Sequence, residues 1–343
     1  MSRDAATVVT AEWLAAALGA PPEPITVESR GAGVGLLGTL VRVCTASGRR
    51  YVVKLPSTDP TNRSIAQQFG YYAREAGTYA SLLPRPGVPA AACHAIVEGA
   101  HGPILVLEDL SAHRPGDQLV GATAHEAMAA ADLAAAIHAA FWNEPLLAAC
   151  PWLPGPTDPV VAGYGRLFDL TWDTFRSMVA GVVPAEHLSI ATRVMTRFAN
   201  VCRAFAEAPR TLVHGDFRLD NLLFGDEGAA TAIDWQLAAW GRGPYDLAFF
   251  LAGSLETDVR RAIEDDVVDR YHAGLVARGV TDYALEQCRH DYRLGHVLNL
   301  PNPVTALVAV SGGNERGAAL LRANARRALA AVADHAHYLS SSA

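Results

Sequence analysis

The amino-acid sequence predicts an α+β protein of two lobes, an N-terminal lobe with an antiparallel β-sheet and a mainly helical C-terminal lobe. Near the N-terminus, the apolar and β-branched runs 39–45 and 50–55 flank a short turn, which is the pattern of a β-hairpin. Farther along, three long segments have the apolar spacing of helices, and the first of them is Ala-rich; they are 124–142, 162–179 and 184–208. We therefore expect the lobes to be residues 1–110 and 111–343.

The other elements of the first lobe follow in order. Residues 10–18 predict a short amphipathic helix with Thr10 as its cap, and the prolines at 21–24 then lead into the first strand. We expect this helix to pack on the N-terminal lobe. A helix at 69–79 and an apolar strand at 103–107 complete the lobe.

The most informative motif is His214-Gly-Asp216-Phe-Arg-Leu-Asp-Asn221, followed by Asp234. Phosphoryl transfer from ATP requires a carboxylate at the acceptor hydroxyl and oxygen ligands for Mg²⁺. This spacing predicts Asp216 as the catalytic base, and Asn221 and Asp234 as metal ligands. Taken singly, each residue could equally be a turn or helix cap. Short strands are predicted around the motif, at 211–213, 222–224 and 231–233.

Upstream, Gly33, Gly35 and Gly38 form G-x-G-x-x-G. Dinucleotide-binding folds use the same string, but there a helix follows it, whereas here a strand follows. The alternative is a glycine loop in a hairpin that covers phosphates, with Lys54 on the third strand binding the α- and β-phosphates. Glu75 is predicted to pair with Lys54, although a solvated helix glutamate is the alternative.

Three phrases of the sequence resemble a known family. His214-Gly-Asp216 with Asn221, Ile-Asp234-Trp-Gln, and Gly-Pro-Tyr-Asp246-Leu-Ala are similar to the aminoglycoside phosphotransferase-like small-molecule kinases. The phrase Val106-Leu-Glu-Asp-Leu110 and the helix around Glu75 resemble the ecdysteroid-kinase-like branch, which bacteria also carry.

The resemblance covers roughly residues 25–300. It implies a protein-kinase-like fold with ATP held in the cleft between the lobes. It places the hinge at Glu108 and Leu110, whose backbone groups would pair with adenine. It also implies that the insertion between the hinge and the catalytic loop, with the helices after Asp246, forms the acceptor pocket.

Four residues are expected to support the catalytic loop. His214 would brace the loop by hydrogen bonding, and Asp246 would hold it through backbone hydrogen bonds at a helix start. Arg218 could offset charge near the γ-phosphate or pair with an acid of the large lobe. Asp220 could touch the acceptor or cap a turn.

The insertion gives two weaker indications about the acceptor. The acids of its stretch 115–160, which has no Lys or Arg, could steer a cationic acceptor or simply be solvated; they are Asp117, Glu126, Asp132, Glu144 and Asp158. Its aromatic residues could line an apolar pocket, although most are expected in the core; they are Trp142, Trp152, Tyr164, Phe168, Trp172 and Phe175. His138, on the same insertion, is expected to have a packing role.

Composition excludes several classes of protein. With 28 basic and 35 acidic residues in 343, the net charge of −7 argues against nucleic-acid binding. Five cysteines without C-x-x-C spacing indicate neither zinc nor disulfides, and no membrane-spanning or signal segment is expected. We expect a cytoplasmic monomer or homodimer. Protein substrates are disfavoured because only a dozen residues separate Asp234 from Asp246.

The sequence therefore predicts an enzyme, an ATP- and Mg²⁺-dependent phosphotransferase that acts on a hydroxyl of a small molecule. The favoured acceptor is an antibiotic or another bulky natural product, as for a resistance or tailoring kinase. A housekeeping kinase of a small amino alcohol or sugar is the alternative. A nucleotide-binding pseudokinase is an alternative of another class.

Overall fold

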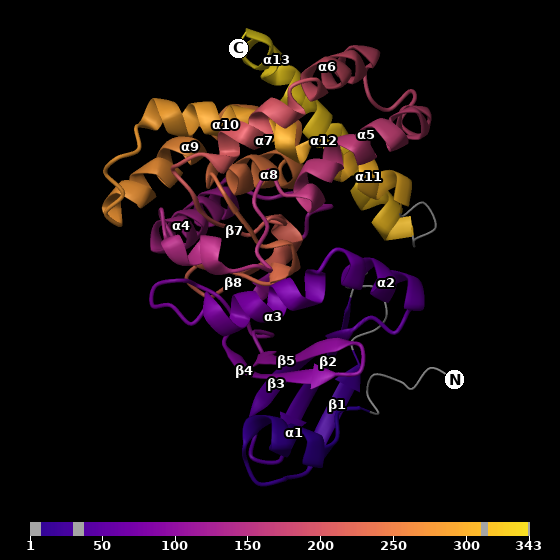
Figure 1. Ribbon diagram of the computed structural model, residues 1–343, viewed down its shortest axis with the longest axis vertical. Helices are drawn as coiled ribbons and strands as arrows, with labels where there is room; N and C mark the ends of the chain where they lie inside the picture. Colours follow the sequence, from indigo (N-terminus) through magenta and orange to yellow (C-terminus); the bar gives the residue numbers. More distant parts are fainter. Residues whose placement is uncertain (1–7, 30–37, 310–314, 342–343) are drawn as a thin grey trace. The chain divides into compact units, whose positions relative to one another are not determined.

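The computed structural model describes residues 8–29, 38–309 and 315–341, and these fall into two compact units (Figure 1). Unit 1 comprises residues 1–114 and 233–237, and unit 2 comprises 115–232 and 238–343. Each unit is described by itself.

Unit 1 contains a five-stranded antiparallel sheet of strand order β1-β2-β3-β5-β4. The strands are β1 (Ile25–Ser29), β2 (Gly38–Thr45), β3 (Arg50–Pro56), β4 (Cys93–Gly99) and β5 (Gly102–Glu108). The predicted strands at 39–45, 50–55 and 103–107 are confirmed as β2, β3 and β5, whereas β4 was not predicted. The register places Lys54 on β3 opposite Leu40 and Leu105, so the lysine lies on a central strand.

Three helices accompany this sheet: α1 (Ala11–Leu18), α2 (Pro60–Gln68) and α3 (Tyr71–Ser81). The hydroxyl of Thr10 accepts a hydrogen bond from the backbone N–H of Trp13, which is the predicted cap of α1. Leu14 of α1 shares a buried cluster with Val43 and Val53, so the first helix packs on the sheet as expected. Helix α3 lies along the sheet near β4 and β5 (Figure 1).

Unit 2 is mainly helical. Its helices are α4 (Ala124–Ala140), α5 (Pro159–Met178), α6 (Ala185–Met195), α7 (Phe198–Ala206), α8 (Pro244–Ser254), α9 (Thr257–Ala277), α10 (Leu285–Asn299), α11 (Pro301–Ala309), α12 (Glu315–Asp334) and α13 (Ala336–Ser341). Short strands frame the catalytic motif: β7 (Thr211–Val213) pairs with β10 (Ala239–Gly241), and β8 (Leu222–Phe224) pairs with β9 (Ala230–Ala232). A two-residue strand, β6 (Arg114–Pro115), lies where the chain passes from unit 1 to unit 2.

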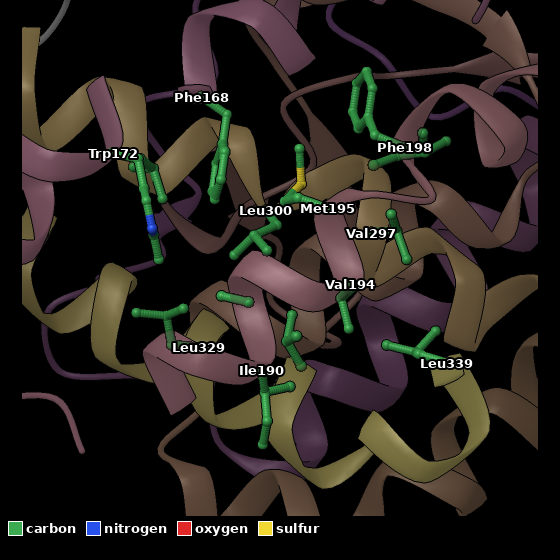
Figure 2. Close-up of a cluster of buried hydrophobic side chains, with 14 of the residues drawn as sticks. Phe168, Trp172, Ile190, Val194, Met195, Phe198, Val297, Leu300, Leu329 and Leu339 are labelled. Carbon is green, nitrogen blue, oxygen red and sulfur yellow. The ribbon is translucent and has the colours of Figure 1, made fainter. Parts of the chain in front are cut away.

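A buried apolar cluster of unit 2 joins helices far apart in the sequence (Figure 2). Phe168 and Trp172 of α5 stack with ring centroids 4.6 Å apart, and Leu329 of α12 belongs to the same cluster. Because burial of such side chains is the main stabilising term, α12 is an integral part of the unit. Among the described residues, no helix combines the length and apolar character that a membrane span requires.

Candidate active site

Lys54, Glu75 and Asp234 meet within unit 1. The Nζ atom of Lys54 lies 2.7 Å from Oε1 of Glu75 and 2.8 Å from Oδ1 of Asp234, so the predicted Lys54–Glu75 ion pair is present. The Glu75 side chain is only 3% exposed, which excludes the alternative of a solvated helix glutamate. Strand β3 and helix α3 hold the first two residues, and Asp234 follows β9 by two positions along the chain.

The electrostatics of this group favour a charged lysine. Burial by itself lowers the pKa of Lys54, but the carboxylates of Asp234 and Glu75 outweigh burial and raise its pKa above the usual value. Asp234 has a φ of 67°, in the left-handed region that non-glycine residues seldom occupy. Such backbone conformations cluster at functional sites because the surrounding structure must stabilise them.

The other predicted nucleotide contacts of unit 1 are only partly visible. Gly33 and Gly35 lie outside the described residues. Gly38 begins β2, and a Cβ atom there would lie 3.4 Å from Cε of Lys54, so a side chain would crowd the lysine. At the predicted hinge, the N–H of Glu108 donates to the carbonyl of Ala92 (2.8 Å), and its side chain is exposed.

In unit 2, the motif His214–Asn221, predicted to be catalytic, forms the loop between β7 and β8. Gly215 has a φ of 81°, which glycine adopts without strain, and turns the chain after β7. Asp216 follows, and its Oδ2 accepts hydrogen bonds from Nδ2 of Asn221 (2.8 Å) and Nε of Arg218 (3.2 Å). Nδ2 of Asn221 also donates to the Asp216 carbonyl (2.9 Å), so Asp216 and Asn221 are fixed against each other.

Asp246 makes the bracing contact that the sequence predicts. Its carboxylate, at the start of α8, is fully buried and accepts the backbone N–H groups of His214 (2.6 Å) and Gly215 (3.0 Å). His214 is itself buried, and its Nδ1 lies 3.3 Å from the backbone nitrogen of Asp216, which donates to it. Asp246 and the His214 ring therefore both hold the backbone of the loop in place.

Sequence reasoning missed one member of this support. His138 was expected to have a packing role, and it is buried, but its Nε2 lies 3.2 Å from Oδ2 of Asp246 and its Nδ1 lies 2.9 Å from the Tyr271 hydroxyl. The histidine thereby links α4, α8 and α9. A buried polar residue in an Ala-rich helix was the available signal, because such residues are nearly always hydrogen-bonded.

Arg218 and Asp220 both belong to the loop that contains Asp216, and they contact each other. Nη1 of Arg218 lies 3.1 Å from Oδ2 of Asp220, so the arginine pairs with two acids of its own loop, Asp216 and Asp220. Oδ1 of Asp220 accepts the backbone N–H of Gln118 (2.7 Å). Asp220 thus links the loop to Gln118, 102 residues away in the sequence, a contact that neither predicted alternative, an acceptor contact or a turn cap, describes.

The five acids of the stretch 115–160 all have partners within unit 2. Asp117 pairs with Arg316 and Asp132 with Arg270. The other three bond backbone N–H groups at or near helix starts: Glu126 in the capping box of α4, Glu144 at the 3₁₀ helix 145–149, and Asp158 before α5. These five carboxylates are therefore explained without a cationic ligand.

The aromatic residues of the insertion divide into two groups. Phe168, Trp172 and Phe175 belong to the buried cluster of Figure 2 and are core residues. The others are partly buried: Trp142, Trp152 and Tyr164. Trp142 packs against Tyr283, so half of the aromatic set is core and part of the rest is engaged internally.

Unit 1 holds a buried lysine paired with two acidic side chains. Unit 2 holds a loop in which Asp216 and Asn221 are hydrogen-bonded to each other and the backbone is held by Asp246. Both are features of a phosphotransferase. The profile of the phosphotransferase enzyme family matches residues 30–284, which is most of the chain. The chain belongs to this family. It is therefore an ATP-dependent kinase of small-molecule hydroxyls. No curated protein matches the chain in sequence comparison.

Solved structures with the same fold act on different kinds of molecule. A Plasmodium vivax ethanolamine kinase has a TM-score of 0.60 at 12% identity, over 92% of this chain and 83% of that one. A putative fructosamine-3-kinase from Thermobifida fusca has a TM-score of 0.51 at 19% identity, over 93% of this chain and 98% of that one. A type I macrolide 2′-phosphotransferase has 0.50 at 17%, over 94% and 98%. At these identities the likeness shows the fold, and it confirms the predicted two-lobed kinase class.

Proposed function

We propose that this protein transfers the γ-phosphoryl group of ATP to a hydroxyl of a small natural product, with Asp216 as the catalytic base. The observation that carries this assignment is the loop geometry, in which Asn221 and Arg218 both contact Oδ2 of Asp216. A carboxylate held in this way is oriented before the acceptor arrives, and orientation supplies much of the rate in phosphoryl transfer. Lys54, held by Glu75, would bind the α- and β-phosphates.

The residues present fit a magnesium ion. Mg²⁺ prefers oxygen ligands and is usually bound by one or two protein groups together with the substrate phosphates. Because Nδ2 of Asn221 donates to Asp216, the amide oxygen of Asn221 is the atom left for a metal, and Asp234 offers a carboxylate. When bound, the ion would neutralise charge on the phosphates.

For adenine, the hinge prediction becomes more specific. The N–H of Glu108 donates to the carbonyl of Ala92, and the carbonyl of Leu110 accepts the N–H of His113 (2.9 Å). We therefore assign the adenine contacts to the carbonyl of Glu108 and the N–H of Leu110. The glycines at 33, 35 and 38 would cover the phosphates.

The acceptor is proposed to be an antibiotic or another bulky natural product that carries little positive charge. All five acids of the stretch 115–160 have a backbone or arginine partner, so their presence does not require a cationic acceptor. This argues against a small amino alcohol, the main alternative, and leaves a sugar possible. The phrase at 106–110 supports placement in the ecdysteroid-kinase-like branch.

The test is ATP consumption with Mg²⁺ against macrolides, nucleoside and peptide antibiotics, aminoglycosides, sterols, choline and simple sugars. We expect acceptor-dependent ADP release, with a mass gain of one phosphate, for a neutral or weakly charged compound. Asp216→Asn should lower kcat by about 10²- to 10⁴-fold while ATP binding is retained. Undiminished turnover in Asp216→Asn would contradict the assignment of the base.

Two other results would favour the alternatives. Turnover confined to choline would indicate the housekeeping amino-alcohol kinase. ATP binding without transfer to any acceptor and without slow hydrolysis would indicate a pseudokinase.

A further inference from the structure

Gln118 is a buried residue that belongs to none of the motifs described above. It lies between β6 and α4 and is 1% exposed. Its N–H donates to Asp220, its Nε2 donates to the carbonyl of Gly253 (3.2 Å), and its carbonyl accepts from Nη1 of Arg327 (2.6 Å). Each of these bonds fixes the residue in place.

The remaining polar atom of Gln118 faces the catalytic loop. Its Oε1 accepts a hydrogen bond from Nη1 of Arg218 (3.2 Å), whose Nε contacts Asp216. The guanidinium is a planar fork of donors, so fixing Nη1 between Gln118 and Asp220 also fixes the direction of Nε. A flexible arginine is thereby held in one orientation against Oδ2 of Asp216.

The anchor of this chain of contacts comes from the far end of the sequence. Arg327 of α12 is 1% exposed, and its Nη atoms also contact the carbonyls of Gly253 (3.3 Å) and Leu119 (3.3 Å). Helix α12 lies beyond residues 30–284, the part that the family profile matches. The support of the loop therefore includes a segment outside the family match.

We propose that Gln118 is a positioning residue for phosphoryl transfer. Through Arg218 it holds the Asp216 carboxylate in the orientation needed at the acceptor hydroxyl, and Arg327 holds Gln118. This inference rests on the proposed role of Asp216.

Two substitutions separate positioning from a merely structural role. Gln118→Glu keeps an oxygen that accepts from Arg218 but loses the Nε2 donor to Gly253, whereas Gln118→Ala loses both. We expect Gln118→Ala to lower kcat by about 10- to 100-fold, with KM for MgATP changed by less than about twofold. Because Gln118→Glu also places a carboxylate oxygen against the Gly253 carbonyl and a new charge beside Arg218, it should recover only part of the activity lost in Gln118→Ala. A kcat in Gln118→Glu no higher than in Gln118→Ala would overturn the proposal.

A double-mutant cycle tests the route through Arg218. If Gln118 acts by way of the arginine, the variant that combines Gln118→Ala with Arg218→Lys should lose no more activity than Arg218→Lys alone. Additive losses would overturn the proposal. Gln287→Ala is the matched control, since it removes another side-chain amide of unit 2, one that donates to Asp291 (2.9 Å). Its kcat should be unchanged.

A spectroscopic readout makes the test independent of the acceptor. The Nε–Hε signal of Arg218, identified as the one lost in Arg218→Lys, should shift or broaden in Gln118→Ala and stay unchanged in Gln287→Ala. An unchanged signal in Gln118→Ala would overturn the proposal. Kinetics use the acceptor found in the panel or, without one, MgATP hydrolysis to water. Retained turnover in Asp216→Asn would refute the proposed base. If Asp216→Asn is inactive and Gln118→Ala turns over as fast as the unchanged protein, only the positioning role is refuted.

Discussion

Some charged side chains of this protein are buried, and only the opposite charges next to them offset the cost of desolvation. The Nζ atom of Lys54 lies 2.7 Å from a carboxylate oxygen of Glu75 and 2.8 Å from one of Asp234. Burial and the neighbouring Asp234 raise the pKa of Glu75, although Lys54 acts against them. Loss of Lys54 would leave two acidic side chains close together without their cation, which is strongly unfavourable, whereas loss of either acid would leave the lysine one partner. Two acidic side chains around one lysine suit a group that binds a divalent cation together with phosphates, in agreement with the proposed role of Asp234.

His296 shows the opposite case, a titratable group that folding keeps neutral. Burial, then the neighbouring His335 and Arg260, lower its pKa well below 6.5, while Glu264 acts against them. The unfolded chain therefore binds one proton more below about pH 6.5, so this histidine costs stability as the pH falls and costs nothing above that pH. We expect the free energy of unfolding to drop by up to about 1.4 kcal/mol per pH unit from this residue.

Urea unfolding of His296→Gln between pH 5 and 8 measures this contribution. The variant should lose less stability on acidification than the unchanged protein, whatever its stability at pH 8. His94→Gln, at an exposed position of β4, is the control and should keep the original pH dependence. The same slope in His296→Gln and the unchanged protein would show that His296 is not held neutral.

At the scale of elements, the start of α8 depends on the absence of a side chain at Gly243. A Cβ atom there would lie 2.3 Å from the Tyr271 hydroxyl and 2.6 Å from Nδ1 of His138, the two groups that meet beside Asp246. We expect Gly243→Ala to destabilise the protein by about 1–3 kcal/mol and to lower kcat, because overpacking would displace the Asp246 brace. Thermal unfolding and steady-state kinetics measure both effects.

Gly163→Ala is the matched control on α5. No atom lies within 4 Å of a Cβ at this position, and alanine favours a helix over glycine. This variant should therefore be neutral or slightly stabilised, by up to about 1 kcal/mol. Equal behaviour of the two alanine variants would argue against the crowding at Gly243.

The features that were predicted correctly from the sequence are those that depend on local spacing. The strands around Asp216, the capped first helix and the Lys54–Glu75 pair follow from short patterns and from the order of motifs. The contacts of His138 and of Gln118 do not, because their partners are distant: His138 and Asp246 are 108 residues apart, and Gln118 and Arg327 are 209 apart. Hydrogen bonds between such positions depend on packing of helices that no local pattern fixes.

At the scale of the whole molecule, the nucleotide-binding group of unit 1 and the catalytic loop of unit 2 are proposed to serve one reaction. Ligand binding to the folded state alone stabilises a protein by RT ln(1 + [L]/Kd), which is about 2.7 kcal/mol at 100 times the Kd. MgATP should therefore raise the midpoint of thermal unfolding by about 4 °C, since a chain of 343 residues shifts by roughly 1.4 °C for each kcal/mol.

Variants in each unit show which residues the stabilisation by MgATP depends on. Asp216→Asn should keep the full shift, because the base is not needed for binding, and Lys54→Met should lose most of it. Asn221→Ala, in unit 2, should make the shift nearly the same for ATP with and without Mg²⁺, if its amide oxygen binds the metal. A shift that survives in Lys54→Met would place the phosphates away from the lysine. A full Mg²⁺ dependence in Asn221→Ala would leave Asp234 as the only protein ligand of the ion among those proposed.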